Sequence, residues 1–214
     1  MPTTLTARDA EILTALTRHV RVFSLSQIAT TWWATSSARV AENRLKHLVT
    51  LGLIQIDHTV AHPEIELPGP LFTWHPGEAD PHLGALSHAL RSRWTEHPAL
   101  TTCVSATKLA ADRFGGHGGR PPRAVERTHD IHFAKVYLHY RRTQPEILSH
   151  WVFEEKIKFE RKLAESGFGE KLPDALLRLP GRTHAVEFGG AYPKDKLSAF
   201  HGYCKDQYYS YEVW

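Results

Sequence analysis

The apolar residues of the first third of the chain recur at helical spacing, with short polar breaks between the repeats. Between Thr6 and Val20 they recur every three or four positions, the spacing of one helix face. Thr6 with Asp9 three residues later is a capping-box pattern, which marks the start of a helix. The same pattern begins at Ser24 and predicts a second, short helix to about Trp33. Two helices are therefore expected, with a short polar turn at residues 34–36 after the second.

A third helix and a hairpin are predicted next. The helix should run from Ser36 to Leu51 and end at Gly52, because glycine readily adopts the positive φ of a helix C-terminus. Partial alternation over residues 53–59 then predicts a strand. An extended, proline-interrupted run over residues 65–74 predicts its hairpin partner.

The outward face of the third predicted helix carries polar side chains that suit DNA. These are Ser37, Arg39, Asn43 and Lys46. Arg39, Asn43 and Lys46 share one face because they are spaced i, i+4 and i+7. Arginine can bind guanine with two hydrogen bonds, asparagine can bind adenine, and lysine suits phosphate. The alternative is an ordinary solvated helix face.

The middle of the chain contains its clearest break. An apolar stripe predicts a helix over residues 81–94, before the glycine-rich stretch 115–122. This stretch is interpreted as a hinge, since it lacks the Gly-Lys-Ser/Thr ending of a phosphate-binding loop. A helix-like run over 128–142 begins with His129 and Asp130. That pair could hold a metal, or Asp130 could cap the helix beside a partly buried histidine.

The last third alternates between extended and helical patterns. Strands are predicted over 150–158, 172–179 and 184–188, a helix over 193–207, and a final strand over 208–214. With the preceding helix, the predicted order is helix–strand–strand–strand–helix–strand.

Two stretches resemble known folds. HLVTLGLIQI, at the end of the third predicted helix, resembles the entry into the wing of a winged helix-turn-helix, and this resemblance covers about residues 5–77. PDALLRLPGRTHAVEFGG, at 173–190, resembles the PD-(D/E)xK restriction-endonuclease-like core, in which Pro-Asp closes one strand and an acid lies on the next. The expected fold is therefore α+β or α/β, with an N-terminal winged helix-turn-helix followed by a restriction-endonuclease-like αβββαβ core.

The whole arrangement resembles the replication-relaxation family of plasmid and mobile-element proteins, over about residues 36–210. The matching features are His129, Pro173-Asp174-Ala175, Glu187, and Lys196-Leu197 with Tyr203. This resemblance implies a DNA-binding protein that acts in replication, transfer or transcriptional control.

The nuclease-like core predicts a candidate metal site. Asp174 and Glu187 on adjacent strands could share Mg²⁺, which prefers oxygen ligands, and Glu155 could be a third ligand. The lysine expected two residues after Glu187 is replaced by Gly189. Lys194 or Lys196 on the next helix could supply that cation, and Lys196 is our candidate catalytic lysine. Otherwise the core is degenerate, needs no cofactor and only binds.

Composition narrows the picture. Two cysteines among 214 residues exclude a disulfide-rich scaffold, and no apolar run is long enough to span a membrane. With no leader pattern, the expected location is the cytoplasm. Residues 1–80 hold 6 basic and 8 acidic residues, residues 81–150 hold 10 and 5, and residues 151–214 hold 10 and 10. The positive charge is therefore concentrated in the middle of the chain.

Three regions are predicted: a winged helix-turn-helix over 1–80, a helical connector over 81–122 and a nuclease-like core over 123–214. The leading hypothesis is a DNA-binding protein with a degenerate core. The alternatives are a Mg²⁺-dependent endonuclease or nickase, and an interaction module such as an antitoxin or immunity component. Double-stranded DNA is the expected partner, and a homodimer would match palindromic sites.

Overall fold

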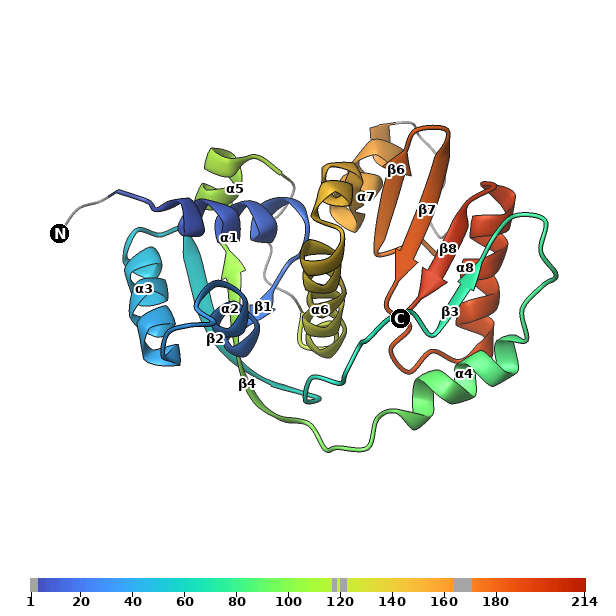
Figure 1. Cartoon of the computed structure of the whole chain (residues 1–214), viewed down its shortest axis with the longest axis horizontal. Coiled ribbons are helices and arrows are strands. Elements are labelled where there is room, and N and C mark those ends of the chain that lie inside the picture. The colour runs from blue at the N-terminus through green and yellow to red at the C-terminus, as the bar shows by residue number, and fades with distance from the viewer. Residues whose placement is uncertain (1–3, 117–118, 120–122, 164–170) are drawn as a thin grey trace. The chain divides into compact units, whose positions relative to one another are not determined.

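The computed structural model contains both helices and strands, in agreement with the mixed α and β class expected. It describes residues 4–116, residue 119, residues 123–163 and residues 171–214. The described strands form two sheets, one of three strands and one of five (Figure 1). The predicted hinge at 115–122 lies largely outside the described residues.

The chain divides into two compact units, each made of two separate segments. The first unit comprises Met1–Pro63 and Pro98–Leu138, and the second comprises Glu64–His97 and His139–Trp214. This division differs from the predicted boundaries at residues 80 and 122. The physical reason is strand pairing, since residues 64–97 contribute a strand to the second unit's sheet, and the chain then returns to complete the first.

The first unit contains helices packed around a small antiparallel sheet of order β1-β4-β2. Its elements are α1 (Ala7–Arg18), β1 (Phe23–Ser24), α2 (Leu25–Trp32), α3 (Ala38–Thr50), β2 (Ile54–Ala61), β4 (Ala99–Ala106) and α5 (Lys108–Phe114). The unit boundary falls inside α6 (Arg127–Thr143). Both predicted capping boxes are confirmed, at Thr6 with Asp9 and at Ser24 with Gln27.

The predicted hairpin partner of β2 is wrong. β2 pairs with β4 along its whole length, from Ile54 opposite Ala106 to Ala61 opposite Ala99. The predicted run over 65–74 contains prolines, which cannot donate a ladder hydrogen bond. Only its end, β3 (Phe72–Trp74), is a strand, and it pairs with β8 (Ser210–Val213) in the second unit.

A buried ion pair ties the two segments of the first unit together. The Arg21 guanidinium lies 3.3 Å from the Asp130 carboxylate, and both side chains are almost fully buried. The Gln27 side chain also donates to the Ile131 carbonyl over 2.8 Å. These contacts hold α6 against the first segment, and Asp130 therefore pairs with arginine rather than capping the helix.

The second unit contains a five-stranded sheet of order β3-β8-β7-β6-β5 (Figure 1). Its further elements are α4 (Leu83–Ser92), the 3₁₀ helix η1 (Pro145–His150), β5 (Trp151–Phe153), α7 (Glu154–Leu163), β6 (Ala175–Leu179), β7 (Arg182–Glu187) and α8 (Lys194–Asp206). β7 and β8 are parallel, and the other pairs are antiparallel. The predicted order of strands and helix is present, but the first strand ends at Phe153 and α7 follows at once.

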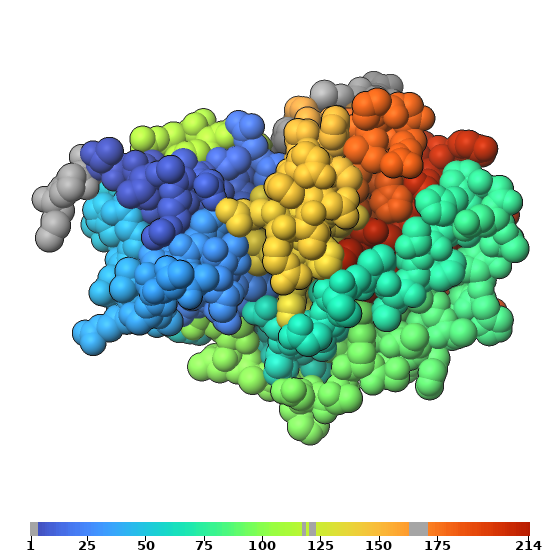
Figure 2. Space-filling view, in the orientation of Figure 1, coloured from blue at the N-terminus to red at the C-terminus, as the bar shows by residue number. Residues whose placement is uncertain are grey.

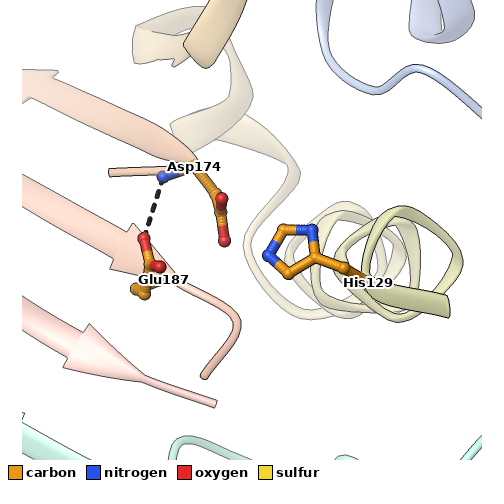
Figure 3. A group of neighbouring side chains, drawn as sticks. All are labelled: His129, Asp174 and Glu187. Carbon is orange, nitrogen blue, oxygen red and sulfur yellow. Dashed lines mark hydrogen bonds between the residues drawn. The ribbon is translucent and has the colours of Figure 1, made fainter. Parts of the chain in front are cut away.

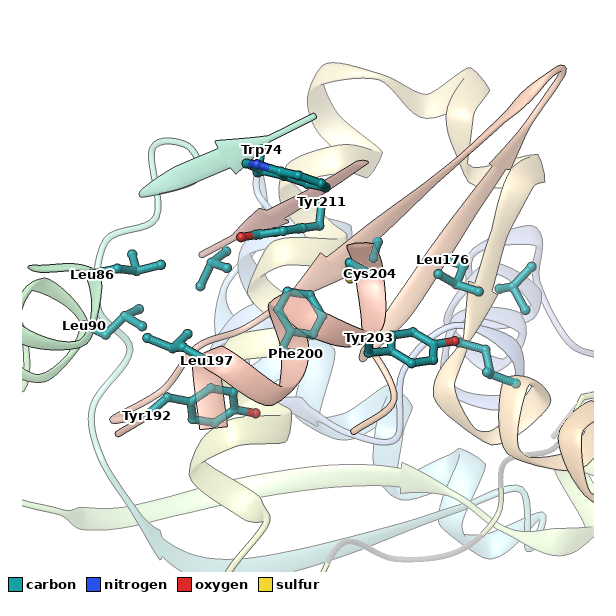
Figure 4. Packing of buried hydrophobic residues seen from close by; sticks show 14 residues of the cluster. Trp74, Leu86, Leu90, Leu176, Tyr192, Leu197, Phe200, Tyr203, Cys204 and Tyr211 are labelled. Atoms are coloured by element: carbon teal, nitrogen blue, oxygen red, sulfur yellow. The ribbon is translucent and has the colours of Figure 1, made fainter. Parts of the chain in front are cut away.

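Aromatic and aliphatic side chains fill the core between this sheet and helices α4 and α8 (Figure 4). Tyr211 of β8 stacks on Trp74 at 5.6 Å between ring centroids and meets Phe200 of α8 edge to face at 5.0 Å. The aromatic residues near the C-terminus are mostly buried here, whereas Tyr208 is 78% exposed. Their main role is therefore to build the core.

Candidate functional site

The predicted DNA-contacting residues lie on the exposed face of α3. Ser37 is the N-cap residue of this helix, and Arg39, Asn43 and Lys46 are all exposed. The segment around α3, sky blue in Figure 2, reaches the surface seen there. The opposite face buries Ala41, Leu45 and Leu48 completely. The periodicity of the sequence therefore sorts the polar and apolar residues of α3 as expected.

Arg44 on the same helix has a different role. Its guanidinium Nε donates to Asp9 over 3.0 Å, and the two residues form an ion pair with Asp9 fully buried. Burial alone would raise the pKa of Asp9, but hydrogen bonds from Arg44 and Thr6 and the Arg44 charge hold it below its ordinary value. Arg44 thus fixes α3 to the start of α1.

The structure brings Asp174 and Glu187 together in the second unit. Asp174 immediately precedes β6, Glu187 ends the neighbouring β7, and the pairing of Ala175 with Val186 places them side by side. The Asp174 backbone N–H donates to Glu187 Oε2 over 3.1 Å (Figure 3). The Phe188 backbone N–H donates to Asp174 Oδ2 over 2.8 Å. Asp174 is 6% exposed and Glu187 is fully buried.

Lys171 is a member of this cluster that the sequence analysis missed. Its Nζ lies 2.6 Å from Glu187 Oε1, which also accepts a 2.7 Å hydrogen bond from the Tyr192 hydroxyl. Burial would lower the pKa of Lys171, but the charges of Glu187 and Asp174 raise it above its ordinary value. The one signal in the sequence is that Lys171 precedes Asp174 by three residues in the same connection.

Lys196, the predicted catalytic lysine, lies at the edge of the same cluster. Its Nζ lies 3.6 Å from the centroid of the Tyr192 ring, a cation–π distance. Burial and the neighbouring charge of Lys171 lower the pKa of Lys196, although the carboxylates oppose this. Lys194 begins α8 and is exposed. Of these two lysines, the geometry therefore favours Lys196.

Packing explains why a lysine cannot occupy the position two residues after Glu187. A Cβ atom at Gly189 would lie 2.7 Å from two Leu90 methyl carbons and 2.9 Å from a Val213 methyl carbon. The close approach of α4 to this strand end therefore requires glycine. A cation for the carboxylates must come from elsewhere, and Lys171 and Lys196 supply it.

The third carboxylate of the cluster is Glu154 rather than the predicted Glu155. The Glu154 backbone N–H donates to the Asp174 carbonyl over 3.0 Å, at the start of α7. Its negative charge contributes to the raised pKa values of Lys171 and Tyr192. Glu155 is the next residue of the helix and is partly exposed. The abrupt change from β5 to helix, absent from the sequence prediction, accounts for the difference.

The donor chemistry of the carboxylate pair fits a hard divalent cation. Asp174 and Glu187 offer the oxygen ligands that Mg²⁺ prefers, and each oxygen can accept more than one partner. Hydrogen bonds and the ion pair with Lys171 engage Glu187 through both of its oxygens, and a hydrogen bond engages Asp174 through Oδ2. A cation here would therefore approach oxygens that Lys171, the Tyr192 hydroxyl and backbone N–H groups already contact.

His129, the histidine singled out by the resemblance, lies on α6 in the first unit. Its Nδ1 lies 3.3 Å from Asp130 Oδ1, and its ring stacks on Phe133 with 6.4 Å between centroids. Within the first unit it is thus a partly buried histidine beside the Arg21–Asp130 ion pair.

Comparisons with known proteins place the chain in no family. No protein-family model matches the sequence, no curated protein matches it significantly, and no solved structure matches the fold significantly. Among the described helices, none combines the length and apolar character needed to cross a bilayer.

Proposed function

We propose that this protein binds double-stranded DNA through α3 of its first unit. The observation that carries the proposal is the exposed face of α3. Arg39, Asn43 and Lys46 lie along this face, and the opposite face is buried. These three side chains can reach base edges and phosphates together if the helix enters the major groove.

The surrounding elements support a winged-helix interpretation. Three helices precede an antiparallel ribbon, and β1 closes the sheet beside β4. The ribbon of β2 and β4 begins just after Gly52, whose φ of 70° ends α3. A ribbon in this position can contact the DNA backbone beside the groove that holds the recognition helix. Its strands are joined through residues of the second unit rather than by a short turn.

The charge of the first unit also supports DNA binding. Its two segments together hold 12 basic and 7 acidic residues, whereas those of the second unit hold 14 and 16. The acidic character predicted for residues 1–80 arose because that range includes acidic residues of the second unit. A net positive unit attracts the phosphate backbone, and this attraction weakens as salt concentration rises.

The test is a fluorescence-anisotropy titration with labelled duplex DNA at low and moderate salt. The triple variant Arg39→Ala/Asn43→Ala/Lys46→Ala should bind at least about tenfold more weakly than the parent protein. The matched control Arg91→Ala/Arg182→Ala removes two exposed cations from the second unit and should bind like the parent. A folded parent that binds no duplex at low salt, or a triple variant with unchanged affinity, would contradict the proposal.

A second candidate function is metal-dependent cleavage of DNA by the second unit. The observation that favours it is the buried pair Asp174 and Glu187 with Lys171 and Lys196 beside them. When bound, Mg²⁺ would polarise a phosphate and lower the pKa of a coordinated water. Asp174 and Glu187 would hold the ion, the Tyr192 hydroxyl keeps Glu187 in place, and Lys196 would stabilise negative charge.

Supercoiled plasmid distinguishes the two candidates. Incubation with Mg²⁺ or Mn²⁺ should give nicked or linear DNA if the second unit is a nuclease, and Asp174→Ala should abolish it. Asp195→Ala removes an exposed carboxylate from the first turn of α8 and is the matched control. Cleavage that persists at the full rate in Asp174→Ala would refute this site. DNA binding without cleavage would leave the first proposal standing alone.

A further inference from the structure

A cation of the protein itself already lies against the proposed metal ligands. The ammonium group of Lys171 is 2.6 Å from Glu187 Oε1, and it also donates to the carbonyl of Leu172 over 2.8 Å. Its side chain is 19% exposed, and that of Glu187 is fully buried. The pair is thus largely removed from water, where charge–charge interactions are strong.

The charges around this pair are close to balance. Asp174, Glu187 and Glu154 all act on Lys171, and each strengthens its hold on the proton. Lys196 adds a second positive charge at the edge of the cluster, and Lys158 pairs with Glu154 over 2.7 Å. The protein can therefore bury its two central carboxylates without a bound ion, because lysine supplies the compensating charge.

We propose that Lys171 is an internal counter-ion that competes with a divalent cation for Glu187. This inference rests on the second candidate function, in which Asp174 and Glu187 hold a metal. An ion shared by the two carboxylates would stand next to the Lys171 ammonium and be repelled by it. Metal binding therefore requires that Lys171 leave Glu187 Oε1, and the ion pair sets the metal affinity of the site.

The test measures Mn²⁺ binding to the full-length protein by isothermal titration calorimetry. Lys171→Met keeps the length of the side chain and removes its charge. This variant should bind Mn²⁺ at least about tenfold more tightly than the parent, because the competing charge is gone. The matched control is Lys205→Met, which removes an exposed lysine paired with Asp80, and it should bind Mn²⁺ like the parent. Lys171→Arg retains the charge and should also show no gain.

The results of the Mn²⁺ titration distinguish failure of this proposal from failure of the second candidate function. Equal Mn²⁺ affinity in the parent and in Lys171→Met overturns the competition and leaves the metal site intact. Absence of Mn²⁺ binding in both overturns the competition together with the second candidate function. Neither result touches DNA binding by α3, which is measured without divalent metal.

A second measurement covers loss of folding in the variant. Removal of the ammonium leaves the Glu187 carboxylate buried with fewer partners, which destabilises the fold. If Lys171→Met is unfolded by circular dichroism, added Mn²⁺ should restore its helical signal, because the ion then takes the place of the ammonium. A variant that remains unfolded at every Mn²⁺ concentration overturns the proposal.

Discussion

The two candidate sites use their charged residues in opposite ways. On α3 of the first unit, Arg39 and Lys46 are exposed to solvent, where a partner can meet them. In the second unit, Asp174, Glu187 and Lys171 are turned toward one another beneath the surface. Exposed charges cost the fold little and suit binding, whereas buried charges are tied to stability and become available only when a partner is exchanged. Function and stability should therefore separate on the exposed face of α3 and coincide at the carboxylate cluster.

Removal of Glu187 should give the largest effect. Glu187→Ala leaves Lys171 charged and the Tyr192 hydroxyl without its acceptor, and it should reduce the free energy of unfolding by about 3–5 kcal/mol. The measurement is urea unfolding followed by circular dichroism. Asp195→Ala, an exposed acid on α8, should change stability by less than about 0.5 kcal/mol. Similar losses in the two variants would show that the buried cluster is not a special source of stability.

Acid should act on the first unit through His19. Burial, and then the charge of Arg18, lowers the pKa of His19 to about 4 from an ordinary value of 6.5. As the pH falls, the unfolded chain binds a proton at this histidine before the folded protein does. The neutral His19 ring therefore does not weaken the fold above pH 6.5, and the free energy of unfolding decreases as the pH falls toward 4. The difference is worth about 3 kcal/mol at about 1.4 kcal/mol per pH unit.

The variant His19→Phe retains a ring to stack on Tyr137 and should flatten the pH dependence of stability between pH 6.5 and 4. His139 also has a pKa lowered by burial, so the slope should decrease rather than vanish. The exposed control His88→Phe should keep the parent slope. Parallel curves for His19→Phe and the parent protein would assign the acid sensitivity to other groups.

Alkali should act on the second unit through Tyr192 and Lys171. Burial and the charge of Glu187 raise the pKa of Tyr192 well above 10.0, and the pKa of Lys171 is raised above 10.5. Groups with raised pKa values contribute full stability below the pKa of the unfolded chain, and this contribution is lost as the pH rises beyond it. The second unit should therefore lose stability above about pH 10.

The variant Tyr192→Phe tests the role of this tyrosine in the alkaline loss of stability, and it should change stability less than Glu187→Ala does. It removes the hydrogen bond to Glu187 and should cost about 2 kcal/mol at neutral pH, the typical value for a bond to a charged group. Its stability should also fall less steeply above pH 10 than that of the parent. Tyr208→Phe changes a tyrosine that is 78% exposed and should alter neither value. An unchanged alkaline slope in Tyr192→Phe would remove this tyrosine from the coupled cluster.

The sequence predicts the local features of both units well. The capping boxes at Thr6 and Ser24 and the polar face of α3 depend on residues within one or two helix turns, and all are present. The pairing of Asp174 with Glu187 was also predictable, because a tight turn between two short strands fixes their register.

The sequence did not predict the strand pairing and side-chain contacts that join segments far apart in the chain. β2 pairs with β4 across an intervening segment of the second unit, and no local pattern specifies that choice. The same limit applies at the carboxylate cluster, where Gly189 is required by Leu90 of α4 and Lys171 comes from an irregular connection. Side chains brought together by tertiary packing carry little signal in sequence spacing.

The smallest expected change in stability is also the sharpest test of the comparison. The triple variant Arg39→Ala/Asn43→Ala/Lys46→Ala alters only exposed positions of α3, and alanine favours a helix. Its free energy of unfolding should therefore remain within about 0.5 kcal/mol of the parent, although its DNA affinity falls. Urea unfolding and anisotropy on the same samples give both values. A large loss of stability would mean that these residues support the fold, and weaker DNA binding could then no longer be attributed to the loss of direct contacts.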